Sequence, residues 1–242
     1  MLELRNISWN VPGGKEVLKD INLIIPDGKL VVITGPNGSG KTTLAKIIAG
    51  IVEPTSGSIF LDGEDITGLN ITERAKKGIS FAFQQPVRFK GITVRDLLEL
   101  SAGKELNQAE LCDLLGKVGL CTRDYIDREV NAALSGGEIK RIEIATVLAR
   151  GTSYSVFDEP EAGIDLWSFT GLIKVFEELK KKNHGTQVII SHQERIINIA
   201  DEVVVIADCV VRNTGAKEKI LPTLLASDKT VGGCPVEMRG AK

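Results

Sequence analysis

Residues 30–43 read LVVITGPNGSGKTT, and this stretch decides the fold. Its first five residues are apolar and mostly β-branched, which predicts a short buried strand. The strand pattern ends abruptly in a glycine-rich segment that fills every fixed position of GxxxxGK[ST], a phosphate-binding loop. Apolar residues then recur at helical spacing between Leu44 and Ile48, and Gly50 ends that pattern. Strand, loop and helix therefore follow in the order that such a loop requires.

The chemistry of the loop predicts a P-loop NTPase. Glycines permit backbone angles that turn successive N–H groups inward, and the following helix points its positive end at the same place. We expect Lys41 to reach the β- and γ-phosphates and the Thr42 hydroxyl to bind Mg²⁺. The expected reaction class is phosphoryl transfer. The expected nucleotide-binding residues of the loop are Gly35, Pro36, Asn37, Gly38, Ser39, Gly40, Lys41, Thr42 and Thr43.

Composition limits the classes of function. The chain has 242 residues, enough for one domain with subdomains, and 30 Lys plus Arg stand against 32 Asp plus Glu. This balance gives no electrostatic reason to expect nucleic-acid binding. The N-terminus lacks the pattern of a signal peptide, and apolar runs such as 202–208 are far below the roughly 20 residues that cross a bilayer. We expect a cytoplasmic protein whose membrane role, if it has one, comes through a partner.

Four cysteines, Cys112, Cys121, Cys209 and Cys234, are scattered without a CxxC pair. Free thiols in a reducing compartment are the simplest interpretation. Cys234 lies in the segment GGCP of the polar C-terminal stretch, where a transient contact with a metal or cluster is the alternative.

A second apolar run, Tyr154 to Phe157, ends in two adjacent carboxylates. An Asp-Glu pair by itself is usually a solvated turn, but after a strand in a P-loop chain it favours catalysis. Successive strand residues face different directions, so the two carboxylates should divide their roles. We expect Asp158 to hold Mg²⁺ through a water molecule and Glu159 to polarise the attacking water.

The segment LSGGE, residues 134–138, precedes a helical stretch that reaches about Arg150. Ser135 and Glu138 form an S-x-x-E capping box, so one interpretation is simply the start of a helix. The other is anion binding, because Gly136 and Gly137 clear side chains from the helix N-terminus and leave its N–H groups accessible.

These motifs, together with FAFQQP, AGID and IISH, occur in the order and spacing that resemble ABC ATPases, from Leu2 to about Gly215. The resemblance implies an α/β fold of the P-loop NTPase class and ABC ATPase type, with a mixed, largely parallel sheet core, an antiparallel β-subdomain and a helical signature subdomain. The expected parts are the nucleotide-binding core with the β-subdomain at 1–84, the helical subdomain at 85–150, the rest of the core at 151–215 and a C-terminal extension at 216–242.

The resemblance also implies a dimer that closes around ATP, in which the LSGGE helix of each subunit contacts the γ-phosphate held by the other subunit. Lys41, Gln84, Glu159 and His192 are then the expected catalytic residues, and Thr42, Gln84 and Asp158 the expected metal-binding ones. By position, the resemblance implies nucleotide contacts from Ser135, Gly136 and Gly137, a link between the two sites through Asp165, a catalytic base at Glu159, a sensor of Mg²⁺ and water at Gln84, and a γ-phosphate contact at His192.

Adenine recognition is open. ABC ATPases often place an aromatic residue near the end of the first strand to stack on adenine, but this chain has Val11 and Pro12 near that position. Trp9 lies two residues earlier on the same strand face. It either stacks on adenine or packs against the core or an interface.

Patterning predicts the remaining elements. Short antiparallel strands with a turn at residues 12–14 are expected in 1–30, and cap signals mark amphipathic helices at 93–101 and 107–119. Another helix is expected at 168–182, with its basic end favoured by the helix dipole. Beyond Gly215 the pattern decays into a polar extension.

Local stretches point to a partner class. FAFQQPV, SGGEIKR, AGID and SHQERII are similar to segments of the SufC group, the ATPases of iron–sulfur cluster assembly, which implies a soluble SufB- or SufD-like scaffold as partner. The alternative is the ATP-binding subunit of a membrane ABC transporter, which Pro160 after Glu159 favours. A role in DNA repair or chromosome organisation is disfavoured, because no long coiled-coil insertion separates the P-loop from LSGGE.

Overall fold

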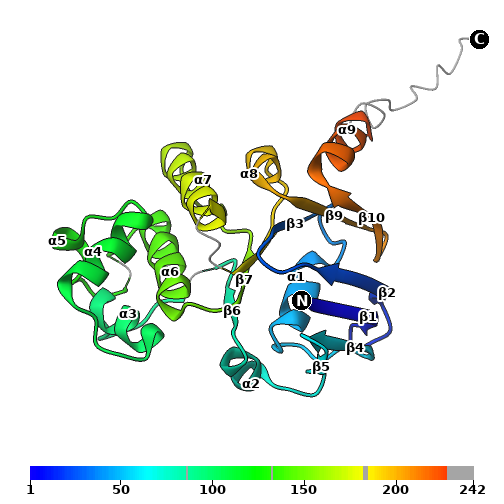
Figure 1. Cartoon of the computed structure of the whole chain (residues 1–242), viewed down its shortest axis with the longest axis horizontal. Helices are drawn as coiled ribbons and strands as arrows, with labels where there is room; N and C mark the ends of the chain where they lie inside the picture. The colour runs from blue at the N-terminus through cyan, green and yellow to red at the C-terminus, as the bar shows by residue number, and fades with distance from the viewer. Residues whose placement is uncertain (86, 132, 182–184, 228–242) are drawn as a thin grey trace, which may run out of the picture.

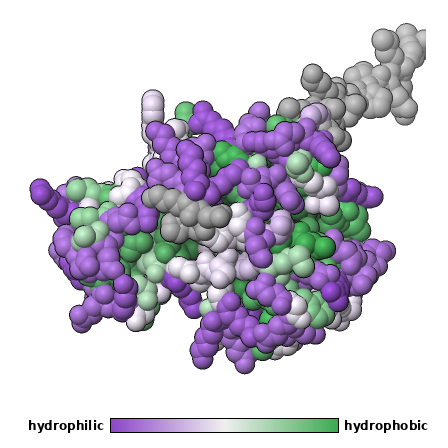
Figure 2. Space-filling model, in the orientation of Figure 1, coloured by the Kyte–Doolittle hydropathy of each residue, from purple (hydrophilic) through white to green (hydrophobic). Residues whose placement is uncertain are grey.

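The computed structural model describes residues 1–85, 87–131, 133–181 and 185–227. Two sheets form the framework, and most helices lie beside the larger one (Figure 1). Hydrophilic side chains cover most of the face shown in Figure 2, since the apolar residues are largely taken up by the packing between sheets and helices.

The larger sheet has six strands in the described part of the chain. Each neighbouring pair is parallel except the pair of β9 and β10, which is antiparallel. Strands β3, β7 and β8 are buried at every residue, as expected for strands covered on both faces. The order across the sheet is β10 (Val210–Ala216), β9 (Glu202–Ala207), β3 (Leu30–Thr34), β8 (Thr186–Ile190), β7 (Tyr154–Asp158) and β6 (Ile79–Ala82).

The smaller sheet is antiparallel and lies at the right of Figure 1. Its first two strands are the hairpin expected in residues 1–30, closed where the Val11 N–H donates to the Lys15 carbonyl. The alternating burial along the second strand shows one face packed on the core and one facing solvent. The order is β2 (Glu16–Ile25), β1 (Leu2–Asn10), β4 (Ser56–Leu61) and β5 (Glu64–Asp65).

A group of helices lies at the left of Figure 1, on the far side from the smaller sheet. They are α3 (Val94–Ala102), α4 (Gln108–Lys117), α5 (Thr122–Tyr125) and α6 (Gly136–Arg150). Three of these helices begin with a capping box, at Thr93, Asn107 and Ser135, as the sequence predicts. The other helices are α1 (Lys41–Ile48), α2 (Ile71–Lys76), α7 (Leu166–Lys181), α8 (Glu194–Ile199) and α9 (Lys217–Ser227).

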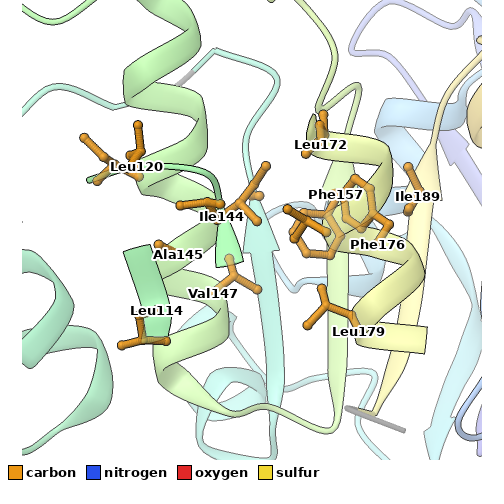
Figure 3. Packing of buried hydrophobic residues seen from close by; sticks show 14 of the residues in the cluster. Leu114, Leu120, Ile144, Ala145, Val147, Phe157, Leu172, Phe176, Leu179 and Ile189 are labelled. Carbon is orange, nitrogen blue, oxygen red and sulfur yellow. The ribbon is translucent and has the colours of Figure 1, made fainter. Parts of the chain in front are cut away.

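Apolar side chains fill both faces of the larger sheet in two clusters. One cluster joins this sheet to the smaller one, and the other joins it to the helices. In the second cluster the rings of Phe157 on β7 and Phe176 on α7 meet edge to face, with centroids 5.0 Å apart (Figure 3). This contact fixes α7 against the strand that carries Asp158.

Replacing Phe176 by Ala should lower the free energy of unfolding by about 3–5 kcal/mol, because a fully buried ring leaves a cavity that the packed cluster fills only partly. Urea denaturation followed by circular dichroism measures this. Leu100→Ala is the control, since Leu100 on α3 is 71% exposed and its loss should change stability by about 0.5 kcal/mol or less. Equal losses for the two variants would contradict the packing described here.

One expected helix start is wrong, and one helix was not expected. Helix α7 begins at Leu166 rather than at Ser168, because Asp165 Oδ1 accepts hydrogen bonds from the N–H groups of Trp167 and Ser168 and so caps the helix earlier. The chain beyond Gly215 is not simply a polar extension, since residues 217–227 form helix α9, with Ile220 buried against the larger core cluster. The pattern hid this helix because Pro222 interrupts it.

Cys112, Cys121 and Cys209 are free thiols, as expected, and Cys234 lies outside the described residues. None of the helices in the described part of the chain is both long and apolar enough to cross a membrane.

Candidate active site

Parallel pairing brings the phosphate loop and three other predicted residues to one edge of the larger sheet. The phosphate loop follows β3, Gln84 comes shortly after β6, Glu159 follows β7, and His192 comes shortly after β8. These strands run in the same direction, so their carboxyl ends lie along one edge, where open α/β sheets bind ligands.

The loop between β3 and α1 keeps polar groups open to a ligand. Gly40 has a φ of 94°, and a Cβ there would lie 2.6 Å from Leu18 Cδ2 and 2.7 Å from the Val17 carbonyl oxygen, so this position requires glycine. No side chain caps the N-terminus of α1. The Ser39 hydroxyl is buried and has no hydrogen-bond partner among the described residues. An anion such as phosphate would satisfy these donors.

Lys41 lies across this loop. It is 5% exposed, and its Nζ donates hydrogen bonds to the carbonyl oxygens of Gly35 and Pro36, both at 2.8 Å. Burial lowers the pKa of the Lys41 ammonium, while the charges of Glu159 and Asp158 oppose that change. The ammonium is therefore held where it can neutralise a phosphate bound in the loop.

Oxygen donors suited to Mg²⁺ lie beside the loop. The Thr42 hydroxyl donates to Asp158 Oδ1 at 3.0 Å, and Asp158 is 1% exposed. Burial raises the pKa of Asp158, the Glu159 charge adds to the rise, and the hydrogen bond from Thr42 opposes it. A divalent cation would offset the crowding of negative charge, and a hydroxyl with a carboxylate is a donor set that Mg²⁺ takes. Thr42 and Asp158 therefore fit the ion expected from the sequence.

Gln84 and Glu159 are in contact. Gln84 Nε2 donates to Glu159 Oε2 at 2.5 Å. The sequence predicted that Asp158 and Glu159 point in different directions because successive strand residues alternate. This reason is wrong, because β7 ends at Asp158 and Glu159 lies outside the strand. Glu159 adopts a φ of 44°, a left-handed conformation that is rare outside glycine and found at functional sites. This turn directs its carboxylate toward the loop.

Glu159 and the loop line a cavity of about 200 Å³. It is open to solvent and large enough to take part of a nucleotide's phosphate chain. Val17 on β2 also lines it and has no counterpart in the sequence predictions, since no motif marks that position. The lining residues are Val17, Asn37, Gly38, Gly40, Lys41, Thr42, Thr43 and Glu159.

His192 is exposed and does not line this cavity. Its neighbour Ser191 is fully buried and donates a hydrogen bond to Glu161 Oε1. Burial raises the pKa of Glu161, and the hydrogen bond from Ser191 opposes the rise. Glu161 thus ties the turn after Glu159 to the turn that carries His192, a contact that no sequence pattern indicated.

The LSGGE residues lie apart from the cavity within one chain. Ser135 Oγ accepts from the Glu138 N–H at 3.2 Å, and Glu138 Oε2 accepts from the Ser135 N–H at 2.7 Å. The capping interpretation is therefore correct, and it leaves Ser135 and Gly136 exposed. A Cβ on Gly136 would lie 3.7 Å from the Gly163 carbonyl oxygen, so the LSGGE turn adjoins the turn that holds Asp165.

Trp9 packs rather than lines the cavity. It is partly buried against the cluster between the two sheets and is not among the cavity residues. Of the two interpretations from the sequence, packing agrees with this position.

Comparison with known proteins agrees with these features. The family described as ABC transporter matches residues 18–162. A Methanocaldococcus jannaschii protein, named as an uncharacterised ABC transporter ATP-binding protein, is 40% identical over 215 residues, which cover 85% of this chain and 86% of the relative. The sulfate/thiosulfate import ATP-binding protein CysA of Synechocystis is 35% identical over 219 residues, 86% of this chain, but these cover only 59% of CysA.

Solved structures agree with the fold. The dimeric structure of a bacterial ABC transporter cassette superposes with a TM-score of 0.80 at 25% identity, covering 90% of this chain and 99% of that one.

Proposed function

Because this chain belongs to the ABC transporter family and is an ABC-type ATPase, we propose that it hydrolyses Mg-ATP to drive a membrane transporter as its ATP-binding subunit. The observation that carries the proposal is the meeting of Lys41, Thr42 and Glu159 around one cavity, with Asp158 hydrogen-bonded to Thr42 beside it. The names of the relatives support the transport role, since both sequence relatives described above are called transport or import ATP-binding proteins.

The residues divide the reaction among them in the following way. Lys41 and the N-terminus of α1 bind the phosphates, and Thr42 with Asp158 would hold Mg²⁺, which would neutralise phosphate charge. Glu159 accepts a proton from the attacking water, which Gln84 helps to orient through its contact with Glu159. His192 is exposed and does not line the cavity, and we assign it to the γ-phosphate from its place in the IISH motif.

A second copy of the chain completes the site. Ser135 and Gly136 are exposed at the start of α6 and do not reach the cavity of their own chain. Beside the Asp165 cap, Leu166 is 63% and Trp167 85% exposed, an apolar surface that a partner subunit would cover. The similar cassette described above is dimeric, which supports a dimer closed by ATP.

The proposed docking surface for the membrane-spanning partner lies next to Gln84 in the chain. Phe83, Val87 and Phe89 border an apolar pocket of about 210 Å³ between the end of β6 and helices α3 and α6. Phe83 is 36% and Val87 47% exposed. We assign this pocket to a helix of the membrane-spanning partner, since an amphipathic helix fits an apolar groove of this kind. The other lining residues are Phe81, Leu97, Ser101, Val130, Ile139, Ile142, Glu143 and Thr146.

The iron–sulfur scaffold implied by the SufC-like stretches is the second candidate partner. Its support is the similarity of segments such as SGGEIKR to the SufC group. It ranks second because the relatives reported above are named for transport.

Replacing Val87 by Asp should reduce recovery of the partner at least about tenfold, because a carboxylate would have to be buried in an apolar pocket. The measurement is copurification of native partners with the tagged chain in mild detergent, followed by mass spectrometry and by iron and sulfide analysis. Leu100→Asp is the matched control, since Leu100 is exposed on α3 and does not line the pocket. Recovery of a soluble scaffold with iron and sulfide, and of no membrane protein, would overturn the transporter assignment.

A further inference from the structure

Two charged residues of α6 hold the peptide backbone just before Gln84. Lys140 Nζ donates a hydrogen bond to the Phe83 carbonyl oxygen, and the Phe83 N–H donates to Glu143 Oε1 at 2.8 Å. The two side chains also form an ion pair, with Lys140 Nζ 2.9 Å from Glu143 Oε2. The backbone N–H and carbonyl oxygen of Phe83 are thus both bound by α6, just after β6 has ended.

Burial of this ion pair costs free energy. Lys140 is completely buried and the Glu143 side chain is 14% exposed. Removing two charges from water costs several kcal/mol for each ion, and apolar residues of similar size often stabilise a protein as well or better. Burial also raises the pKa of Glu143, against the opposing effect of Lys140. Stability alone is therefore a weak explanation for an ion pair at this place.

The pair connects the LSGGE helix with the residue that precedes Gln84. Helix α6 begins at the LSGGE turn, and Lys140 is five residues after Ser135, about one and a half helical turns. Phe83 is followed directly by Gln84, whose amide donates to Glu159. A helix is stiff over this length, so a tilt of its N-terminus moves Lys140 and Glu143 with it.

We propose that Lys140 and Glu143 are positioning residues that hold Gln84 against Glu159 and transmit the orientation of the LSGGE helix to that contact. The proposal rests on the role assigned to Gln84 above. When a second subunit's nucleotide binds at the LSGGE turn, α6 is fixed, and the clamp on Phe83 sets the Gln84 amide at the attacking water. ATP binding at Lys41 does not depend on the clamp, because neither residue lines the phosphate cavity.

The test is the double variant Lys140→Met/Glu143→Leu, which removes both charges and both bonds to Phe83 while keeping apolar volume. Removal of both members of a buried pair is often neutral for stability, whereas removal of one leaves a buried charge unpaired. The double variant is therefore expected to fold with a Tm close to that of the parent. Its kcat for ATP should fall about tenfold or more, because a misplaced catalytic group costs up to about 10²-fold, and its KM should change by less than about twofold.

The matched control is Lys117→Met/Asp113→Leu, which removes another ion pair within one helix, on α4, and should leave kcat unchanged. Gln84→Ala and the combination of all three substitutions complete the series. If the clamp acts through Gln84, the double substitution lowers kcat in the parent and has no further effect in the Gln84→Ala background.

The outcomes separate the proposals. Loss of kcat in Gln84→Ala with an unchanged kcat in a folded clamp variant overturns the clamp and leaves the active site intact. An unchanged kcat in Gln84→Ala overturns the role of Gln84 and the clamp with it. If the double variant does not fold, Lys140→Arg gives the second measurement. Arg keeps the positive charge but changes the length and shape of the side chain, so kcat should fall while KM stays unchanged. A parental kcat in that variant would overturn the positioning role of Lys140.

Discussion

Glu159→Gln should lower the rate of ATP hydrolysis by roughly 10²- to 10⁴-fold, the usual contribution of a general base. The amide keeps the size of the side chain and its place beside Gln84, but it cannot accept a proton from water. Because ATP then stays bound, we also expect the variant to persist as a dimer in saturating Mg-ATP. Phosphate release measures the first effect, and light scattering during gel filtration measures the second.

A control separates this effect from a general change of charge. Glu178→Gln alters an exposed carboxylate on α7 and should leave both the rate and the ATP-dependent dimer unchanged. A Glu159→Gln protein that hydrolyses ATP at the parental rate would remove Glu159 from the role of base. A variant that is inactive but monomeric with ATP would instead count against the closed dimer.

Lys41→Ala should weaken nucleotide binding by roughly 10²-fold or more and abolish turnover. The ammonium is buried over the loop, and a hydrogen bond from a charged donor contributes about 1.5–3 kcal/mol where water is excluded. Its loss also leaves the Gly35 and Pro36 carbonyls without their partner, so the loop itself loosens. Equilibrium binding of a fluorescent ATP analogue, with Tm recorded in parallel, measures the change.

Lys41→Arg and Lys29→Ala complete this experiment. Arg keeps the charge but not the compact ammonium, so it should bind poorly too, whereas Lys29 is exposed and remote from the cavity and its loss should have no effect. Unchanged binding and turnover in Lys41→Ala would remove the assignment of residues 35–43 as the phosphate site.

Local features were predictable from the sequence because their parts lie within a few residues of one another. Thr93 with Asp96 and Asn107 with Glu110 form the capping boxes that the spacing indicated. Where the prediction was wrong, a local bond had been missed, as at the Asp165 cap, or a proline had hidden a helix, as at Pro222.

Contacts between distant residues were predictable only where a motif marked both partners. Thr42 and Asp158 are 116 positions apart and were both assigned to Mg²⁺, and they are bonded. Lys140 and Phe83 are 57 positions apart, and no pattern connects a lysine inside a helix with the backbone of a loop. Glu161 and Ser191 are a similar case.

Residue spacing by itself determined that this chain has a buried strand, a phosphate loop and a helix at 30–48, a carboxylate pair after a second strand, and a capped helix at LSGGE. These are properties of short segments, set by backbone geometry and local hydrogen bonding. Only the tertiary structure decided that β6, β7, β8 and β3 lie side by side, so that Gln84, Glu159 and the loop meet at one edge, and that α6 binds the backbone before Gln84. The reason is that strand neighbours and helix placement follow from burial of the whole apolar core, which no single segment specifies.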